Sequence, residues 1–152
     1  MENNGLIEVY LKGVEASPME YALFLGNELK SFTIFVGSDV GSTILMHEQG
    51  VKRPRPLTHD LVKNMFLGLG ASIEKVIIND LRDSTFYARI FIKEENELGK
   101  KIIEVDARPS DSIALALRFN ARIFVTRDVF NRVEDVSKFL KDKGQSEQEE
   151  SE

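Results

Sequence analysis

The apolar and polar positions of the chain change period several times, and each change marks a different element. Leu6–Val14 alternates apolar and polar side chains, as a half-buried strand does. Tyr21–Asn27 and Ser31–Gly37 are β-branched or aromatic runs joined by a short polar link, which predicts a hairpin. Four later stretches also have the composition of strands: 72–81, 85–94, 100–108 and 121–126.

Helices are predicted between these strands. A short one follows Gly37 and stops at Gly50, a second spans about 57–69, a third begins near Pro109, and a last one lies around 133–143. In the second helix, a stripe of apolar side chains recurs at four-residue spacing and is expected to face the core: Leu61, Met65 and Leu69. The element order fits a single α+β domain with a largely antiparallel β-sheet and about four helices.

Length and charge are consistent with one folded body and a tail. The 152 residues suffice for one core, and the absence of Cys excludes disulfides, thiolate zinc sites and cysteine nucleophiles. Four Glu in 144–152 account for most of the net charge of −5, so the body is close to neutral. We therefore expect a domain over 1–143 and a disordered acidic tail over 144–152.

The first residues, MENNGLIEVYLKG, are acidic and amide-bearing where a signal peptide would carry positive charge. No apolar run approaches the ~20 residues that a membrane span needs. These features predict a cytoplasmic protein without a membrane partner.

Two segments with an Arg-Pro pair stand at predicted helix starts, RPLTHDL from Arg55 and RPSDS from Arg108. Proline is favourable at the first helical position, where the N–H that it lacks would be unpaired. Thr58 and Ser110 are candidate caps, and the aspartates that follow lie where the helix dipole favours negative charge, Asp60 and Asp111. Helix initiation thus explains these segments except for Arg55, Arg108 and His59.

Those three side chains have a functional interpretation and a structural one. An arginine before a helix start adds a bidentate fork for phosphate to a site where backbone N–H groups already attract anions. Alternatively, Arg108 pairs with a nearby aspartate and braces the loop. His59 lies away from the Leu61 stripe, so it is expected outside the core, where it could be a general base, a metal ligand or a phosphate donor.

The aspartates also raise the possibility of a metal site. Asp60, Asp106 and Asp111 offer the oxygen ligands that Mg²⁺ or Mn²⁺ prefers, and such ions assist phosphodiester hydrolysis. Their spacing matches no established metal motif.

The two segments, with FYARI between them and RIFVT after them, resemble the bifunctional nuclease domain family, and the resemblance covers about 6–128. It implies a compact α+β domain that associates with itself and a nuclease activity on DNA and RNA known for plant members. The matching positions are Arg55, Thr58, His59, Asp60, Asp106, Arg108, Ser110, Asp111 and Arg118. Family members usually carry a Gly-x-x-Glu-Ala segment before the first motif, whereas this chain has Asp39 and Val40 there.

Three functions remain open. In the first, the domain is a metal-assisted nuclease in which His59, Asp60, Asp106 and Asp111 are catalytic, with the three aspartates holding Mg²⁺ or Mn²⁺. The phosphate-binding positions are then Arg55, Thr58, Arg108, Ser110 and Arg118. In the second, the same cluster binds an anion or another ligand without chemistry, because the near-neutral body and the single dense basic stretch, KRPR, argue against strong nucleic-acid binding. In the third, Asp–Arg pairs brace a self-associating scaffold, and a homodimer is expected because one domain leaves apolar strand surface uncovered.

Overall fold

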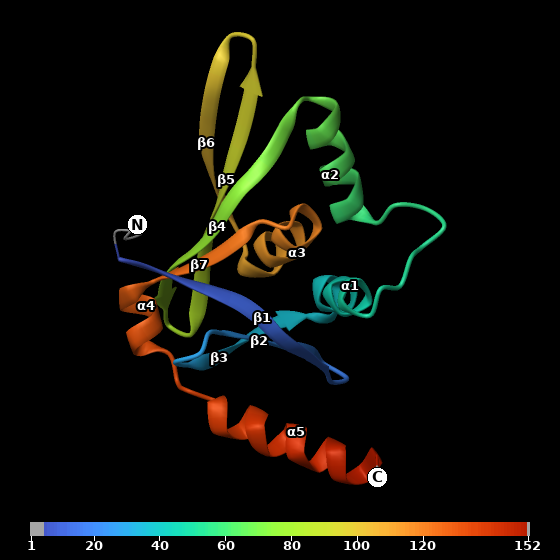
Figure 1. Cartoon of the computed structure of the whole chain (residues 1–152), viewed down its shortest axis with the longest axis vertical. Coiled ribbons are helices and arrows are strands. Elements are labelled where there is room, and N and C mark those ends of the chain that lie inside the picture. Colours follow the sequence, from blue (N-terminus) through green and yellow to red (C-terminus); the bar gives the residue numbers. More distant parts are fainter. Residues whose placement is uncertain (1–4, 152) are drawn as a thin grey trace.

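The computed structural model describes residues 5–151, which form an α+β domain with seven strands and five helices (Figure 1). The strands are β1 (Leu6–Ala16), β2 (Glu20–Gly26), β3 (Ser31–Gly37), β4 (Ala71–Arg82), β5 (Thr85–Asn96), β6 (Gly99–Ala107) and β7 (Arg122–Thr126). The helices are α1 (Ser38–Glu48), α2 (Thr58–Gly68), α3 (Pro109–Phe119), α4 (Arg127–Arg132) and α5 (Ser137–Ser151). The α+β class and the mostly antiparallel sheet are confirmed.

The strands form one sheet in the order β3-β2-β1-β7-β4-β5-β6, in which only β4 and β7 are parallel. The parallel pair requires a crossover, and α3 supplies it between β6 and β7. The helices α1, α2 and α3 lie together on one side of the sheet, and the hairpin of β5 and β6 extends beyond the body (Figure 1).

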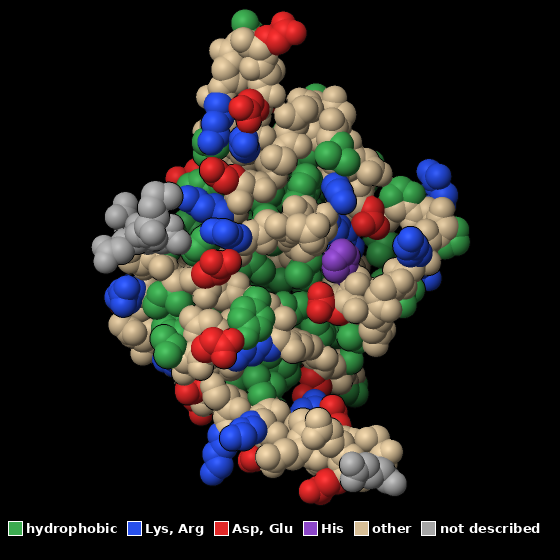
Figure 2. All heavy atoms as spheres, viewed as in Figure 1, with side chains coloured by type: hydrophobic (Ala, Val, Ile, Leu, Met, Phe, Trp, Pro, Cys, Tyr) green, Lys and Arg blue, Asp and Glu red, His purple; other side chains and the backbone are tan. Residues whose placement is uncertain are grey.

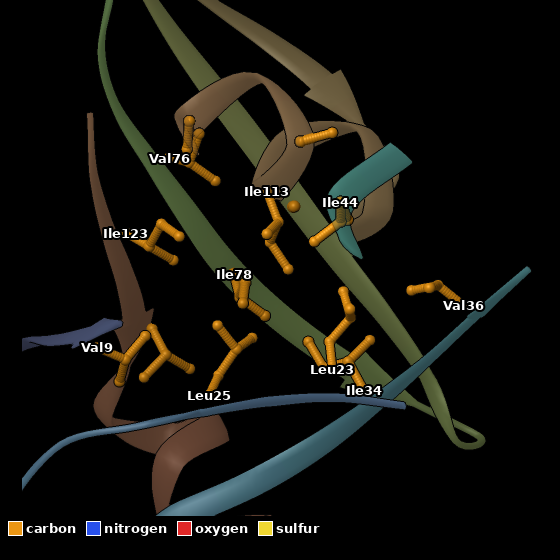
Figure 3. Packing of buried hydrophobic residues seen from close by; sticks show 14 of the residues in the cluster. Val9, Leu23, Leu25, Ile34, Val36, Ile44, Val76, Ile78, Ile113 and Ile123 are labelled. Atoms are coloured by element: carbon orange, nitrogen blue, oxygen red, sulfur yellow. The ribbon is translucent and has the colours of Figure 1, made fainter. Parts of the chain in front are cut away.

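The core lies between the sheet and the helices α1 and α3. Figure 3 shows aliphatic side chains from five strands converging on Ile44 of α1 and Ile113 of α3, both with no exposed surface. Helix α1 lies close to β2, because a Cβ at Gly41 would come within 2.6 Å of Tyr21. This packing fixes where α3, and with it the Arg108 segment, sits relative to α1.

Helix α2 turns the opposite face to the core from the one expected. Leu61, Met65 and Leu69 are between 51% and 73% exposed, whereas Val62 and Phe66 pack against the core and His59 is only 8% exposed. The expectation that His59 lies outside the core is therefore wrong. The physical reason is that α2 has apolar side chains on both faces, and a polar partner on α3 is available to His59.

The helix count also differs from the prediction. The additional helix, α4, is capped by Thr126, whose hydroxyl accepts a hydrogen bond from the Val129 N–H at 3.3 Å. Helix α5 continues to Ser151 through the segment 144–151, where a disordered tail was expected. Residues 144–151 are all exposed, so this part of α5 does not pack against the body. Within residues 5–151, the structure has no helix that is both long and apolar enough to span a bilayer.

Candidate functional site

The two Arg-Pro segments begin α2 and α3, as the sequence predicts, but the helices are capped differently. The N-cap positions are Leu57 and Arg108, and neither Thr58 nor Ser110 makes a side-chain cap. At the start of α2 it is the third helical residue that caps the helix, because Asp60 Oδ2 accepts a hydrogen bond from the Leu57 N–H at 2.9 Å. Pro109 occupies the first helical position of α3.

The segments meet in space through a chain of three polar side chains. His59 Nε2 lies 2.8 Å from Asp111 Oδ1, and Arg108 Nε donates to Asp111 Oδ2 at 2.9 Å. The Asp111 carboxylate is therefore held on both oxygens, by a residue of α2 on one side and by the N-cap residue of α3 on the other. His59 Nδ1 is buried and has no hydrogen-bond partner among the described residues. The neutral tautomer that protonates Nε2 fits this environment, since it leaves no buried N–H unpaired.

A second cross-link joins the same two helices. Arg118, whose side chain is 5% exposed, donates from Nε to Asp60 Oδ1 at 2.8 Å and from Nη1 to the Ala114 carbonyl at 3.0 Å. Asp60 therefore also has both oxygens engaged, one by Arg118 and the other by the Leu57 N–H. The side chain of Arg118 is enclosed by the fold, whereas the side chain of Arg108 is 64% exposed.

These pairs set the charge states of the two aspartates. Burial of Asp111 on its own raises the pKa, but the hydrogen bonds from Arg108 and His59 outweigh burial and hold the pKa below its ordinary value of 3.8. Burial likewise raises the pKa of Asp60, and the hydrogen bonds from Arg118 and the Leu57 N–H outweigh it. The hydrogen bond to Asp111 raises the pKa of Arg108. Both aspartates are therefore anionic near neutral pH.

Two adjoining hollows open over these cross-links. The His59 hollow, of about 280 Å³, is lined by Asp39, Thr58, His59, Arg108 and Asp111. The Arg55 hollow, of about 350 Å³, is lined by His47, Lys52, Arg53, Arg55, Asp60 and Arg118. Thr43 and Leu57 line both hollows. Figure 2 shows basic side chains gathered over the connection between α1 and α2, and a histidine with acidic and basic neighbours beside it.

The remaining predicted site residues lie elsewhere. Asp106 is on the exposed strand β6, where its nearest ionic partner is Arg89 at 3.8 Å, and it lines neither hollow. Ser110 is buried and lines a third hollow, on the other side of Arg108. The structure thus brings together seven of the nine predicted residues over two hollows that share a wall.

The model of the bifunctional nuclease domain matches residues 23–137, which include both segments and both hollows. The chain belongs to the bifunctional nuclease domain family. Uncharacterized proteins from two strains of Mycobacterium tuberculosis are 42% identical over 96 residues, covering 63% of this chain and 54% of theirs. Bifunctional nuclease 1 of Oryza sativa subsp. indica is 30% identical over 82 residues, covering 53% of this chain and 24% of the plant protein. The match to this chain spans about half the length of the mycobacterial relatives and about a quarter of the plant one.

A divalent cation does not fit the side chains of this bifunctional nuclease domain as they are arranged. Asp60 and Asp111 each accept an N–H on both oxygens, and Asp106 lies apart on β6. A cation beside either aspartate would also face the guanidinium that already pairs with it. Within residues 5–151, no three carboxylate or imidazole groups are placed to hold a metal together. The three aspartates of the metal hypothesis therefore do not form one coordination site here.

Asp39 is a charged residue of the His59 hollow that was absent from the predicted site. It stands in the segment where this chain departs from the usual Gly-x-x-Glu-Ala of bifunctional nuclease domains, and its negative charge contributes to the raised pKa of Arg108. That departure was the sequence signal that could have identified it. Of the two alternatives for Arg108, pairing with a nearby aspartate is present, because Nε donates to Asp111, and the side chain of Arg108 is nevertheless 64% exposed.

Proposed function

We propose that this domain hydrolyses phosphodiester bonds of nucleic acid in the His59 hollow. The observation that carries the proposal is the His59–Asp111–Arg108 chain, which joins the two family motifs and leaves Arg108 open to solvent. Family membership supports a nuclease, and the geometry supports this hollow as the place where a phosphate binds.

Arg108 is the phosphate-binding group in this proposal. Its Nε is committed to Asp111, and within residues 5–151 its terminal nitrogens donate to no protein acceptor, so they can bind phosphate oxygens. The starts of α2 and α3 add positive dipole ends on the same side. Charge that builds on the phosphate as a water molecule attacks is then neutralised by groups already in place.

Asp111 and His59 have different tasks. Asp111 is anionic, and the second lone pair of one of its oxygens accepts a hydrogen bond from the attacking water. As the water oxygen bonds to phosphorus, its proton passes to solvent, the P–O bond to the leaving nucleoside oxygen breaks, and that oxygen takes a proton from solvent. His59 cannot reach a phosphate from Nδ1, which is buried, or from Nε2, which faces Asp111. We therefore propose His59 as a positioning residue that fixes Asp111. No step of this proposal uses a metal ion.

In this proposal, the nucleic-acid strand that is cut also passes over the Arg55 hollow. Its basic side chains Lys52, Arg53 and Arg55 form no ion pair with an acidic group among the described residues. Phosphates on either side of the scissile bond can bind there, since the two hollows share a wall. The substrate is then a nucleic-acid strand and not an isolated phosphate.

Cleavage of labelled single- and double-stranded DNA and RNA by highly purified protein tests the proposal, with Mg²⁺, Mn²⁺ or EDTA in parallel. Arg108→Met and Asp111→Asn are expected to lower the rate by about 10²–10³. Asp128→Asn is the matched control, because this exposed acid of α4 lines neither hollow and, among residues 5–151, forms an ion pair only with Arg132. Asp106→Asn is expected to resemble the control. Full activity in Asp111→Asn would refute the proposed site, and the EDTA arm measures whether a cation is required.

A second candidate function is a ligand-binding scaffold without catalysis. The hydrogen bonds of Asp60 and Asp111 favour it, because each carboxylate oxygen of these two residues already has a protein partner that links parts of the fold. The same hydrogen bonds disfavour a metal ion. In this case no variant or condition gives cleavage, while nucleic acid or a simple anion still binds. A steep fall of affinity with added salt identifies phosphate contacts, and a flat response identifies a different ligand.

We also propose that two copies associate through the outer face of α2. Leu61, Met65 and Leu69 recur at four-residue spacing along one side of this helix and are all more than half exposed, and an open apolar stripe of this kind is uncommon on a monomer. Light scattering is expected to give a dimer mass for the native chain and a monomer mass for the double variant that carries both Leu61→Lys and Met65→Lys. A monomeric native chain at assay concentrations would refute this interface.

A further inference from the structure

The twisted sheet brings its edge strand β3 close to the turn between β4 and β5. Although four strands separate β3 from β5 in the sheet, the rings of Phe32 and Phe86 lie 6.1 Å apart. The turn is tight, since Asp83 and Ser84 both have left-handed backbone angles, with φ of 48° and 64°. A hollow forms where this turn, β3 and the start of α3 meet.

This Phe35 hollow, of about 350 Å³, combines aromatic, hydroxyl and cationic side chains. Phe35 of β3, which is 62% exposed, and Phe86 of β5 line it together with Ser84, Thr85 and Arg108. None of the residues that line it is acidic. The Ser84 and Thr85 hydroxyls have no side-chain hydrogen bond to another residue of 5–151.

Arg108 connects this hollow to the proposed site, because it lines both the Phe35 hollow and the His59 hollow. In a ligand that fills both hollows, the charge of Arg108 favours an anionic group beside it, and the ring of Phe35 favours a flat apolar group. A nucleotide unit has this composition: a phosphate, and a base with two π-faces and polar edges. The hydroxyls of Ser84 and Thr85 can donate to or accept from the base edge.

We infer that the Phe35 hollow binds an unstacked base of single-stranded nucleic acid, next to the phosphate held by Arg108. The inference rests on the proposed function and names its substrate class. A base inside a duplex is stacked on both faces and cannot enter, so single strands are preferred. Stacking on one aromatic side chain tolerates any base, and sequence preference at this position is expected to be weak.

A tryptophan placed at Phe35 reports on this contact directly, since the chain has no Trp of its own. Phe35→Trp is titrated with a single-stranded oligothymidylate of about eight nucleotides in EDTA and low salt. Saturable quenching of its fluorescence is expected. Phe139→Trp is the matched control, an aromatic position that is 53% exposed on α5 and is expected to show no saturable change.

Binding of a labelled oligonucleotide, followed by anisotropy, gives the second readout. Phe35→Ala is expected to weaken affinity about 5- to 100-fold, as loss of one stacked base does, and Phe139→Ala to leave it unchanged. Binding with native affinity by Phe35→Ala, absent quenching in Phe35→Trp, or no binding by the native chain would each overturn the subsite. Failure of the proposed function is distinct, because it appears as absent cleavage or as full activity in Asp111→Asn.

Discussion

Removal of the Asp60–Arg118 cross-link distinguishes a residue that stabilises the fold from one that takes part in the reaction. Replacement of Asp60 by Ala leaves the Arg118 side chain, which is 5% exposed, with the Ala114 carbonyl as its one remaining acceptor among residues 5–151, and it leaves the Leu57 N–H without its acceptor. Breaking a fully buried pair in this way costs about 3–5 kcal/mol, and loss of a helix-start hydrogen bond about 1 kcal/mol. Asp60 is itself 39% exposed, so solvent screening reduces the first figure. We expect a loss of about 2–4 kcal/mol in the free energy of unfolding.

Arg118→Met is expected to cost less than Asp60→Ala, at about 1–2 kcal/mol, because it removes the buried charge instead of leaving it unpaired. The double variant should then be less destabilised than the two single changes together, by at least about 1 kcal/mol. Urea denaturation of all four proteins measures this coupling. In a chain of this size, Asp60→Ala lowers the melting temperature by about 5–15 °C.

The exposed pair of Arg89 and Glu104, which lie 3.1 Å apart on neighbouring strands, is the control. Glu104→Ala is expected to cost less than about 1 kcal/mol. If the changes at Asp60 and Arg118 are additive, the pair does not stabilise the fold as argued. If Asp60→Ala abolishes activity while the folded fraction stays high, Asp60 belongs to the chemistry and not to the brace.

Three further predictions test other parts of the structure. Because the pKa of Asp111 is lowered in the folded state, its ionised form contributes stability that is complete well above pH 3.8 and is lost as the pH falls through the lower folded pKa. The free energy of unfolding in urea should therefore fall less steeply below about pH 4 in Asp111→Asn than in the native chain. Gly41→Ala should destabilise by more than about 1 kcal/mol, because its Cβ would lie 2.6 Å from Tyr21, whereas Gly68→Ala, with open space around it, should stabilise by about 0.5–1 kcal/mol in thermal melts. Arg55→Ala should weaken binding of single-stranded DNA and reduce the dependence of log affinity on log salt by about one phosphate contact, and an unchanged slope would remove the Arg55 hollow from the interface.

The strands and most helix starts could be predicted from the sequence because their signals are local. The alternation in Leu6–Val14 and the Arg-Pro start of α3 act within a few residues, and the structure places β1 and α3 accordingly. The short helix α4 was missed, although Thr126 followed by Asp128 is a start signal, because six residues give too little periodicity.

The inward face of α2 could not be predicted for the opposite reason. Met65 and Phe66 are neighbours in an apolar helix with two equivalent stripes, and tertiary contacts with α3 and β4 select between them. His59 is buried because Asp111 lies 52 positions away in the chain and meets it in space, and Arg118 is buried because Asp60 does the same across 58 positions. Pairings over such separations leave no periodic signal in one sequence.

The two Arg-Pro segments look equivalent in sequence, yet their charges end in different places. In the first segment, both oxygens of Asp60 accept hydrogen bonds from within the domain, and its partner Arg118 is buried. In the second, Asp111 holds an arginine that remains 64% exposed and borders both the His59 hollow and the Phe35 hollow. A ligand can therefore reach the start of α3 but must displace a structural pair to use the aspartate of α2. This asymmetry favours the start of α3 as the place of the proposed chemistry, and the start of α2 then holds that site in shape.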